Sequence, residues 1–167
     1  MLAGEYWMGL YYLNRGDLPL ACLEHMQHFF RDAATASGHP APKLMMTDPY
    51  GIFGIFKAQP MQPEHAEWLA ACRKLAEKGD MDAVTALYTV TDLPEAELRR
   101  YLAPLEKKAA SGDQDALSQL AFIKVDWLKE NPANVIETLK QYRKNAKPVL
   151  LARIGELALA LDGNCLL

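Results

Sequence analysis

A nine-residue segment of this chain occurs twice, with the two copies 33 positions apart. The first copy is Gly-Asp-Met-Asp-Ala-Val-Thr-Ala-Leu at 79–87, and the second is Gly-Asp-Gln-Asp-Ala-Leu-Ser-Gln-Leu at 112–120. The aspartate after each glycine, Asp80 or Asp113, suits the N-cap of a helix because its carboxylate accepts a backbone N–H. Self-similarity at this period is typical of stacked helix hairpins, in which each unit buries its apolar face only against its neighbours. The segment therefore predicts an all-α fold built from repeats.

The repeat period divides the chain into successive helix hairpins. We expect one solenoid domain with units at 1–38, 39–79, 80–112 and 113–145, followed by a capping helix over 146–162. This plan contains about eight or nine helices. A glycine closes each of the first three units, and Asn145 closes the fourth. Asn145 is expected to take the left-handed conformation that glycine adopts at a helix end.

Apolar residues at helical spacing, together with start and stop signals, place the individual helices. The expected helices of the first two units cover 3–14, 20–36 and 64–78. In the third unit a first helix ends near Thr91, and Asp92 caps the second helix, with Pro94 in its first turn. Pro104 lies inside that second helix. We expect it to kink or split the helix because proline removes one backbone donor.

The fourth unit follows the same plan. Its first helix is expected to end near Leu128, and Asn131 caps its second helix, which starts at Pro132. One apolar stripe of that second helix consists of Val135, Ile136, Leu139 and Tyr142. A last apolar helix over 148–161 has no second helix after it, as a terminal capping element would.

The second unit is longer than its successors, and its extra residues form an irregular stretch. It has 41 residues instead of 33, and the excess lies near 46–63, where prolines and glycines interrupt an apolar run. This pattern favours an extended or hairpin-like excursion over a helix. Long loops in compact domains are often functional. Two interpretations stay open: its aromatic residues contact a partner, or they only pack over a weakened repeat joint.

Composition and charge exclude several classes of protein. Half of the residues are hydrophobic and 23% are charged, which is too apolar for a disordered chain. The formal net charge of −3 gives no electrostatic footprint for nucleic acid. The N-terminus has no basic region followed by a continuous apolar run, so no signal peptide or membrane span is predicted. We expect a cytoplasmic protein, or a periplasmic one if a signal peptide has been removed.

The sequence offers few groups for chemistry. Its cysteines, Cys22, Cys72 and Cys165, form no C-x-x-C pair and suit buried single thiols. No nucleophile elbow and no phosphate-binding glycine loop is present. The carboxylates that recur with the repeat are explained by capping and by the helix dipole; they are Asp80, Asp82, Asp113 and Asp115. We therefore predict no catalytic residue, no metal site and no cofactor.

Two histidines give an alternative. His25 and His28 are three positions apart and so lie near one face of a helix, as two ligands of a zinc ion would. A tetrahedral site needs further ligands, and two partly exposed helix histidines explain the same pattern. The alternative to a non-enzymatic protein is therefore a helical metal-binding protein or enzyme. It would use His25 and His28 together with nearby carboxylates.

Two kinds of segment are the most characteristic of the repeat units. They are Gly-Glu-Tyr-Trp-Met-Gly-Leu-Tyr-Tyr at 4–12 and the junctions at 75–80 and 107–113. With these segments the units resemble the Sel1-like repeats, which are relatives of the tetratricopeptide repeats. The resemblance covers most of the chain, with departures. Tyr88 and Ala121 stand where the family usually has glycine, the junctions at 38–39 and 145–146 lack the Gly-Asp pair, and 46–63 matches no repeat.

This resemblance implies a fold and a broad class of function. Stacked Sel1-like hairpins form a right-handed superhelix with an extended concave face. Such proteins serve as adaptors, as regulators and, in some bacterial toxin clusters, as immunity proteins. We expect a non-enzymatic module that binds another protein or a peptide through the concave face, with an assembly subunit that stacks on itself as a further alternative. Aromatic candidates for the contact are Trp7, Tyr11, Tyr50, Phe53, Phe56 and Tyr88.

Overall fold

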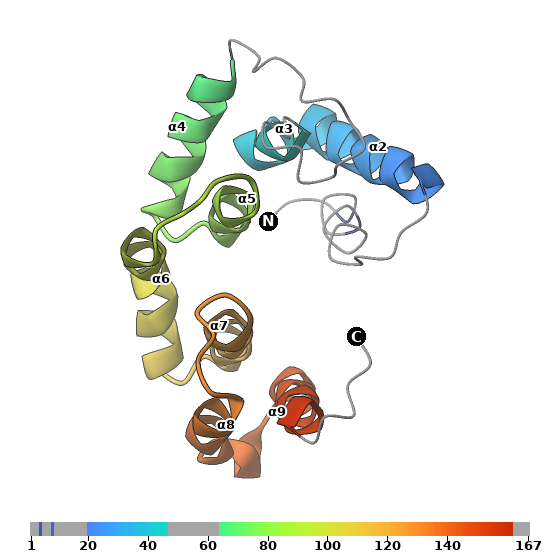
Figure 1. Cartoon of the computed structure of the whole chain (residues 1–167). Helices are drawn as coiled ribbons and strands as arrows, with labels where there is room; N and C mark the ends of the chain where they lie inside the picture. The colour runs from blue at the N-terminus through green and yellow to red at the C-terminus, as the bar shows by residue number, and fades with distance from the viewer. Residues whose placement is uncertain (1–3, 5–7, 9–19, 47–63, 162–167) are drawn as a thin grey trace. The chain divides into compact units, whose positions relative to one another are not determined.

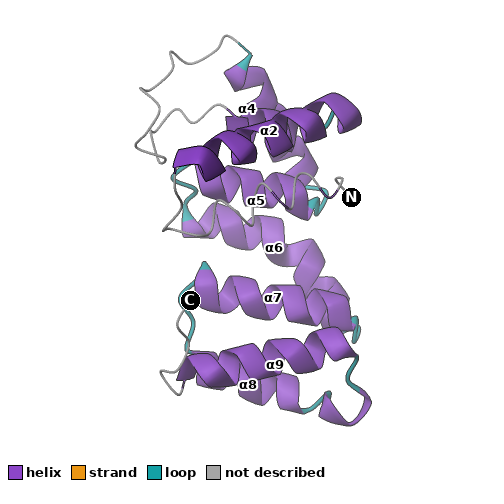
Figure 2. Ribbon diagram, turned by 90° about the vertical axis from the view of Figure 1, so that its right-hand side faces the viewer, coloured by secondary structure: helices purple, strands orange, loops and turns teal. Residues whose placement is uncertain are grey.

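The computed structural model describes residues 4, 8, 20–46 and 64–161 of the chain. All regular structure in these ranges is helical, which confirms the all-α prediction (Figures 1 and 2). The α-helices are α2 (Leu20–Ser37), α3 (Pro40–Met46), α4 (His65–Ala76), α5 (Met81–Val90), α6 (Glu95–Ala110), α7 (Gln114–Asp126), α8 (Pro132–Lys140) and α9 (Pro148–Leu161). A short 3-10 turn, Arg143–Asn145, precedes α9.

The chain divides into two compact units, Met1–Tyr101 and Leu102–Leu167. The division falls inside α6. Pro104 also lies inside this helix, which continues on both sides of it. Of the two expected outcomes the split is therefore not found, and the kink stays a prediction. Pro104 has no N–H to donate to the carbonyl of Arg100, one turn earlier. The helical hydrogen bonding is therefore interrupted in the turn where the two units meet along the chain.

In the first unit, α3 is the central element. It packs against α2, α4 and α5, and α4 packs against α5. Leu44 and Met45 of α3 and Val84 and Leu87 of α5 are buried in this core. The contact between α3 and α5 joins helices that open successive repeats. Packing of this kind is what a stack of hairpins requires, because each hairpin buries its apolar face on the next.

The second unit has the same scheme. Helix α7 packs against α8 and α9, and α8 packs against α9. Figure 2 shows α7 and α9 running alongside each other. Ile123 of α7, Leu139 of α8 and Leu150 of α9 are buried. The first helices of two successive repeats, α7 and α9, therefore contact each other here as α3 and α5 do in the first unit.

Glycines in the left-handed region close three of the repeats. The φ angles are 64° at Gly38, 82° at Gly79 and 87° at Gly112. Asn145 does not follow them, so the prediction for this residue is wrong: it ends the 3-10 turn, and Lys129, with φ 55°, is the non-glycine residue with positive φ in the described ranges. The Asn145 carbonyl instead accepts a hydrogen bond from Nε2 of Gln114, at 2.9 Å.

Gly112 gives a test of the junction. A Cβ added there would meet no atom within 4 Å, so replacing Gly112 by alanine strains only the backbone. We expect the free energy of unfolding to fall by about 1–2 kcal/mol. Gly155→Ala, measured on monomeric protein at low concentration, is the matched control, because a Cβ there meets no atom of the chain within 4 Å and the residue lies inside α9. For this control the free energy of unfolding should rise by about 0.5–1 kcal/mol. Denaturant unfolding followed by circular dichroism measures both free energies of unfolding. Equal changes for Gly112→Ala and Gly155→Ala would contradict the left-handed backbone conformation at Gly112.

Side-chain caps begin the repeated helices, as predicted. Oδ1 of Asp80 accepts the N–H of Ala83 at 2.9 Å. Oδ1 of Asp113 accepts the N–H groups of Asp115 and Ala116 at 3.0 and 3.1 Å. Each cap satisfies backbone donors that have no partner inside the helix. The recurring aspartates Asp80 and Asp113 thus have a structural explanation.

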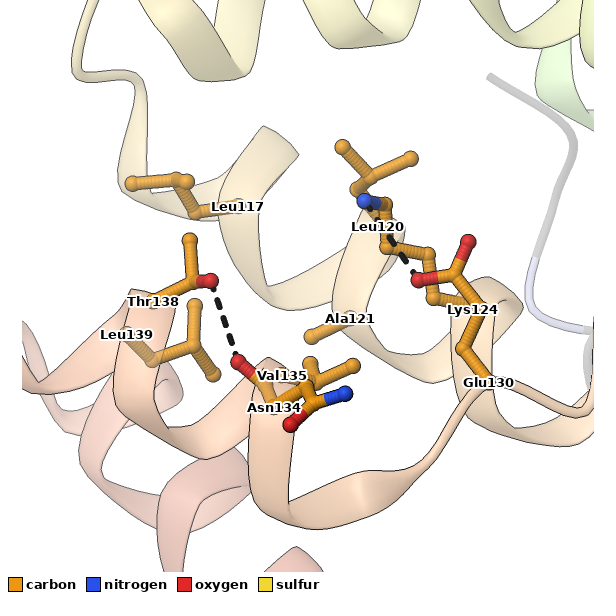
Figure 3. Close-up of a pocket in the computed structure, with 9 residues that line it drawn as sticks. All are labelled: Leu117, Leu120, Ala121, Lys124, Glu130, Asn134, Val135, Thr138 and Leu139. Atoms are coloured by element: carbon orange, nitrogen blue, oxygen red, sulfur yellow. Dashed lines mark hydrogen bonds and ion pairs between the residues drawn. The ribbon is translucent and has the colours of Figure 1, made fainter.

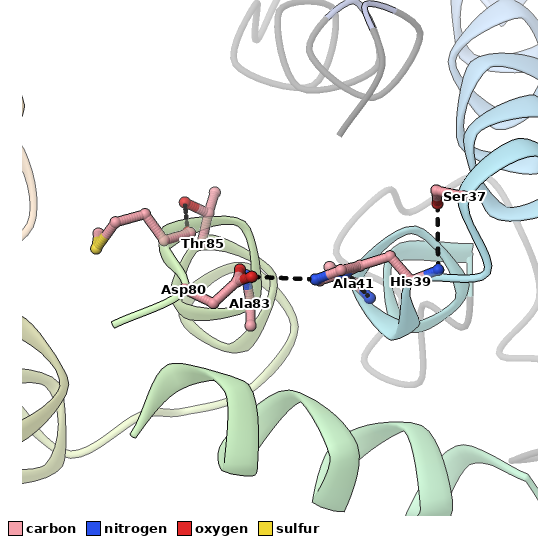
Figure 4. A network of polar contacts seen from close by, with 7 residues as sticks. Ser37, His39, Ala41, Asp80, Ala83 and Thr85 are labelled. Atoms are coloured by element: carbon pink, nitrogen blue, oxygen red, sulfur yellow. Dashed lines mark hydrogen bonds and ion pairs between the residues drawn. The ribbon is translucent and has the colours of Figure 1, made fainter. Parts of the chain in front are cut away.

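A histidine takes the place of aspartate at the start of α3 (Figure 4). Nδ1 of His39 accepts the N–H of Ala41 at 3.1 Å, and its Nε2 lies 3.3 Å from Oδ2 of Asp80. Because Nδ1 accepts a hydrogen bond, the ring proton is on Nε2, and the Nε2–H group donates a hydrogen bond to Oδ2 of Asp80. His39 therefore caps its own helix and hydrogen bonds the residue that caps the first helix of the next repeat.

Most helix positions match the sequence analysis, but some differ. Helix α8 ends at Lys140, so Tyr142 lies beyond the helix on whose apolar stripe it was expected. Helix α3 was not predicted. Helix α6 begins at Glu95, so Asp92 is not its N-cap; Leu93 precedes a proline and is biased toward extended backbone, which delays the helix. Met46, placed at the start of the irregular stretch, is the last residue of α3. The rest of that stretch, 47–63, and the expected helix at 3–14, apart from Gly4 and Met8, lie outside the described residues.

Candidate functional site

A cleft of about 120 Å³ opens between α7 and α8 in the second unit (Figure 3). Both helices contribute to its wall. The lining residues are Leu117, Leu120, Ala121, Lys124, Glu130, Asn134, Val135, Thr138 and Leu139. Lys124 and Glu130 face each other at one end of the cleft, and Leu117 and Thr138 lie toward the other end.

The cleft has an apolar floor and a polar rim. Leu117, Ala121, Val135 and Leu139 are buried and form the floor. At the rim, Nζ of Lys124 lies 3.6 Å from Oε2 of Glu130. A surface ion pair of this kind contributes little to stability. The pair places two charges that compensate each other at one end of the apolar cleft.

The turn between α7 and α8 sets the shape of this end of the cleft. The N–H of Glu130 donates to the carbonyl of Lys124 at 2.8 Å, which returns the chain to the end of α7. Lys129 takes a positive φ of 55° in this turn. Asn131 then caps α8, since its Oδ1 accepts the N–H of Ala133 at 2.9 Å and Pro132 follows at the first helical position. The predicted cap at Asn131 is confirmed.

The lining suits binding more than bond-making chemistry. Its titratable groups are Lys124 and Glu130, and they pair with each other. The hydroxyl of Thr138 donates to the carbonyl of Asn134 at 3.1 Å and so has its polar hydrogen engaged. None of the nine lining residues is a histidine, cysteine or serine. What the cleft offers a ligand is apolar contact area, with polar groups only at its edge.

The aromatic residues predicted to contact a partner lie mostly outside the described ranges. This holds for Trp7, Tyr11, Tyr50, Phe53 and Phe56. Tyr88 is described: it lies on α5 in the first unit and is half-buried. It does not line the α7–α8 cleft. Whether these aromatic residues contact a partner stays a prediction.

The two histidines of the alternative hypothesis lie on α2. His28 is exposed, and its Nε2 lies 3.2 Å from Oδ2 of Asp32, one turn along the helix. The side chain of His25 is outside the described part of the structure. Among the residues that are described, no three histidine, cysteine, aspartate or glutamate side chains are grouped closely enough to hold a metal ion.

Buried titratable groups lie away from the cleft. Cys72 of α4 is buried and unpaired, and the pKa of its thiol is raised to about 12, first by burial and second by the nearby Asp80 carboxylate. Its burial agrees with the prediction for the single thiols, while the side chains of Cys22 and Cys165 are not described. A thiol with this pKa is a poor nucleophile and ligand at neutral pH.

Sequence reasoning named Val135 and Leu139 only as part of an apolar stripe and missed the cleft. The one local signal for it was the Asn131-Pro132 start of α8, which fixes where the stripe begins. None of the described helices combines the length and the apolar character needed to cross a membrane. Comparison of the chain with models of protein families, with curated proteins and with solved structures gives no match.

Proposed function

We propose that the chain is a non-enzymatic interaction module that binds another protein or a peptide, and that the α7–α8 cleft takes an apolar side chain of that partner. The observation that carries the proposal is the apolar floor of an open cleft on a scaffold of helix hairpins. Grooves between helices are common sites for such anchors. A Sel1-like superhelix with a concave face is the larger arrangement that we propose around it.

The size of the cleft limits the group that it holds. An apolar cavity of about 150 Å³ accommodates a benzene ring, so the smaller cleft of about 120 Å³ suits one aliphatic side chain, such as leucine or isoleucine. Burying such a side chain contributes about 1.5–3 kcal/mol. This is enough for an anchor but not for a complete interface, and the partner therefore needs further contacts on the rim or on neighbouring repeats.

Two neighbouring residues of α8 give a matched test. Thr138 and Glu137 are both exposed, but only Thr138 lines the cleft. Peptides selected from a random-sequence phage library against the full chain should share a large apolar residue. We expect Thr138→Trp to weaken their binding at least about tenfold, or 1.4 kcal/mol, because the indole ring blocks the cleft.

The control is Glu137→Trp, which places the same side chain one position away. It should leave peptide affinity within about twofold, or 0.4 kcal/mol, of the unmodified chain. Isothermal titration calorimetry measures the three affinities. Selected peptides that bind the Thr138→Trp and Glu137→Trp variants equally well would show that the cleft is not their site.

A further inference from the structure

Helix α9 exposes an apolar face that the described part of the chain leaves uncovered. Leu151 and Leu159 are 46% and 53% exposed, and Pro148, Ala152, Gly155 and Ala158 are exposed beside them. These positions follow the spacing of one helix face, as residues i, i+3, i+4, i+7, i+10 and i+11 do. The two charged residues of α9, Arg153 and Glu156, do not belong to it. The face is therefore an uncharged strip along the helix.

The corresponding face of α7, one repeat earlier, packs against the next repeat helix, α9. One side of α7 interacts with α9 and with the residue before it. Oδ2 of Asp115 lies 3.3 Å from Nζ of Lys147, next to the start of α9, and Oγ of Ser118 donates to the carbonyl of Val149 at 3.4 Å. Phe122 lies on the same side, with its ring centre 5.0 Å from the guanidinium carbon of Arg153. This side of α7 is the one on which the next repeat stacks.

Adding the repeat period of 33 to the residue numbers of α7 identifies the corresponding side of α9. Shifting Asp115, Ser118 and Phe122 by 33 positions gives Pro148, Leu151 and Gly155. These are residues of the uncovered strip. In α9 the polar serine of the stacking side is replaced by leucine, and the aromatic residue by glycine. The strip is thus the stacking side of the last described repeat helix, with a more apolar composition than the stacking side of α7.

Gly155 indicates how closely a neighbour approaches. A glycine inside a helix costs about 0.5–1 kcal/mol relative to alanine. A Cβ at this position would meet no atom within 4 Å, so packing within the described chain does not require glycine. Small residues in the middle of a helix face allow the backbone of a second helix to come close.

We propose that this strip pairs with the same strip of a second copy of the chain, with the two α9 helices antiparallel and crossing at Gly155. Leu151 and Leu159 lie four residues on either side of Gly155, or about 6 Å along the helix. In this arrangement Leu151 of each copy packs opposite Leu159 of the other. The strip carries no charge, so two copies meet without repulsion.

The test measures the mass of the full chain by sedimentation equilibrium between about 1 and 200 µM. We expect a reversible dimer. Leu151→Glu/Leu159→Glu should weaken association at least about tenfold, because each glutamate then faces a glutamate of the other copy. Met46→Glu is the matched control, since Met46 is an exposed apolar residue of α3. It should dimerise as the unmodified chain does. Circular dichroism melts should show that both variants fold, because the replaced side chains are outside the core.

A second measurement does not depend on the charged variant. In a chain with Cys22→Ser and Cys165→Ser, Gly155→Cys should form a disulfide-linked dimer under mild oxidation, because the two Gly155 positions meet at the crossing point. Glu137→Cys on α8 should stay unlinked. An unmodified chain that is monomeric throughout, or a double-glutamate variant that still dimerises, would overturn the proposal. So would a monomer that associates only after removal of 162–167, since that segment would then be the occupant of the strip.

Discussion

Leu87→Ala is expected to lower the free energy of unfolding by about 2–5 kcal/mol. Leu87 is fully buried on α5, the helix that packs against both α3 and α4. Removing its side chain loses apolar contacts and leaves a cavity that these three helices fill only in part. Denaturant unfolding followed by circular dichroism measures the change. Hydrogen exchange should accelerate in α3, α4 and α5, because the cavity lies among them.

The control for this prediction is Leu159→Ala. Leu159 is 53% exposed on α9, so its truncation should change the free energy of unfolding by no more than about 0.5 kcal/mol. This control is measured at a protein concentration low enough to keep the chain monomeric. An equal loss for Leu87→Ala and Leu159→Ala would mean that the packing around α5 is not as described.

Cys72 is expected to react with a thiol reagent about 1,000-fold more slowly in the native chain than in the unfolded chain at pH 8. The reactive species is the thiolate. Burial, with a smaller contribution from Asp80, raises the pKa of Cys72 from 9.0 to about 12, so the native protein holds far less thiolate. A chain with Cys22→Ser and Cys165→Ser leaves Cys72 as the single thiol. Absorbance after addition of an aromatic disulfide, with and without urea, measures both rates, and similar rates would contradict the burial of this thiol.

The same pKa shift predicts how stability depends on pH. In the unfolded chain the Cys72 thiol loses its proton near pH 9, whereas in the native chain it keeps it until about pH 12. The native state therefore binds more protons in this window, and the free energy of unfolding falls as the pH rises through it. Tyr101 acts in the same direction, since burial and the hydrogen bond to Glu97 raise its pKa. Cys72→Ala should make the dependence between pH 9 and 11 shallower.

The parts of the fold that sequence predicts well are set by local chemistry. The caps at Asp80, Asp113 and Asn131 involve backbone donors two or three residues away, so they are visible in the sequence. Helix α3 was missed because it is short and contains two prolines. Both lie in its first turn, where a missing N–H costs nothing because that donor has no partner in the helix. At Asn145, a contact from Gln114, at the start of the same repeat, replaced the expected local cap.

The candidate site was harder to predict, for a physical reason. Val135 and Leu139 have the same spacing whether a neighbouring helix covers them or leaves a cleft beside them. Whether a cleft forms beside these two residues depends on the position of α7 relative to α8. That position in turn depends on the turn that contains Lys129 and Glu130. A lysine with positive φ is not recognisable from sequence. The aromatic residues chosen instead were selected by type, and of these only Tyr88 lies in the described ranges.

The side chain of Gln114 makes two hydrogen bonds that depend on the length of the repeat. Gln114 donates from Nε2 to the carbonyl of Asn145 at 2.9 Å and accepts the N–H of Lys147 at Oε1, at 2.5 Å. Both partners lie close to one period further along the chain. An insertion or deletion between 129 and 144 that shifted Asn145 and Lys147 would move both backbone groups away from the amide of Gln114. A change in the length of this repeat therefore costs stability through the loss of the two Gln114 hydrogen bonds, even where the altered loop is exposed to solvent.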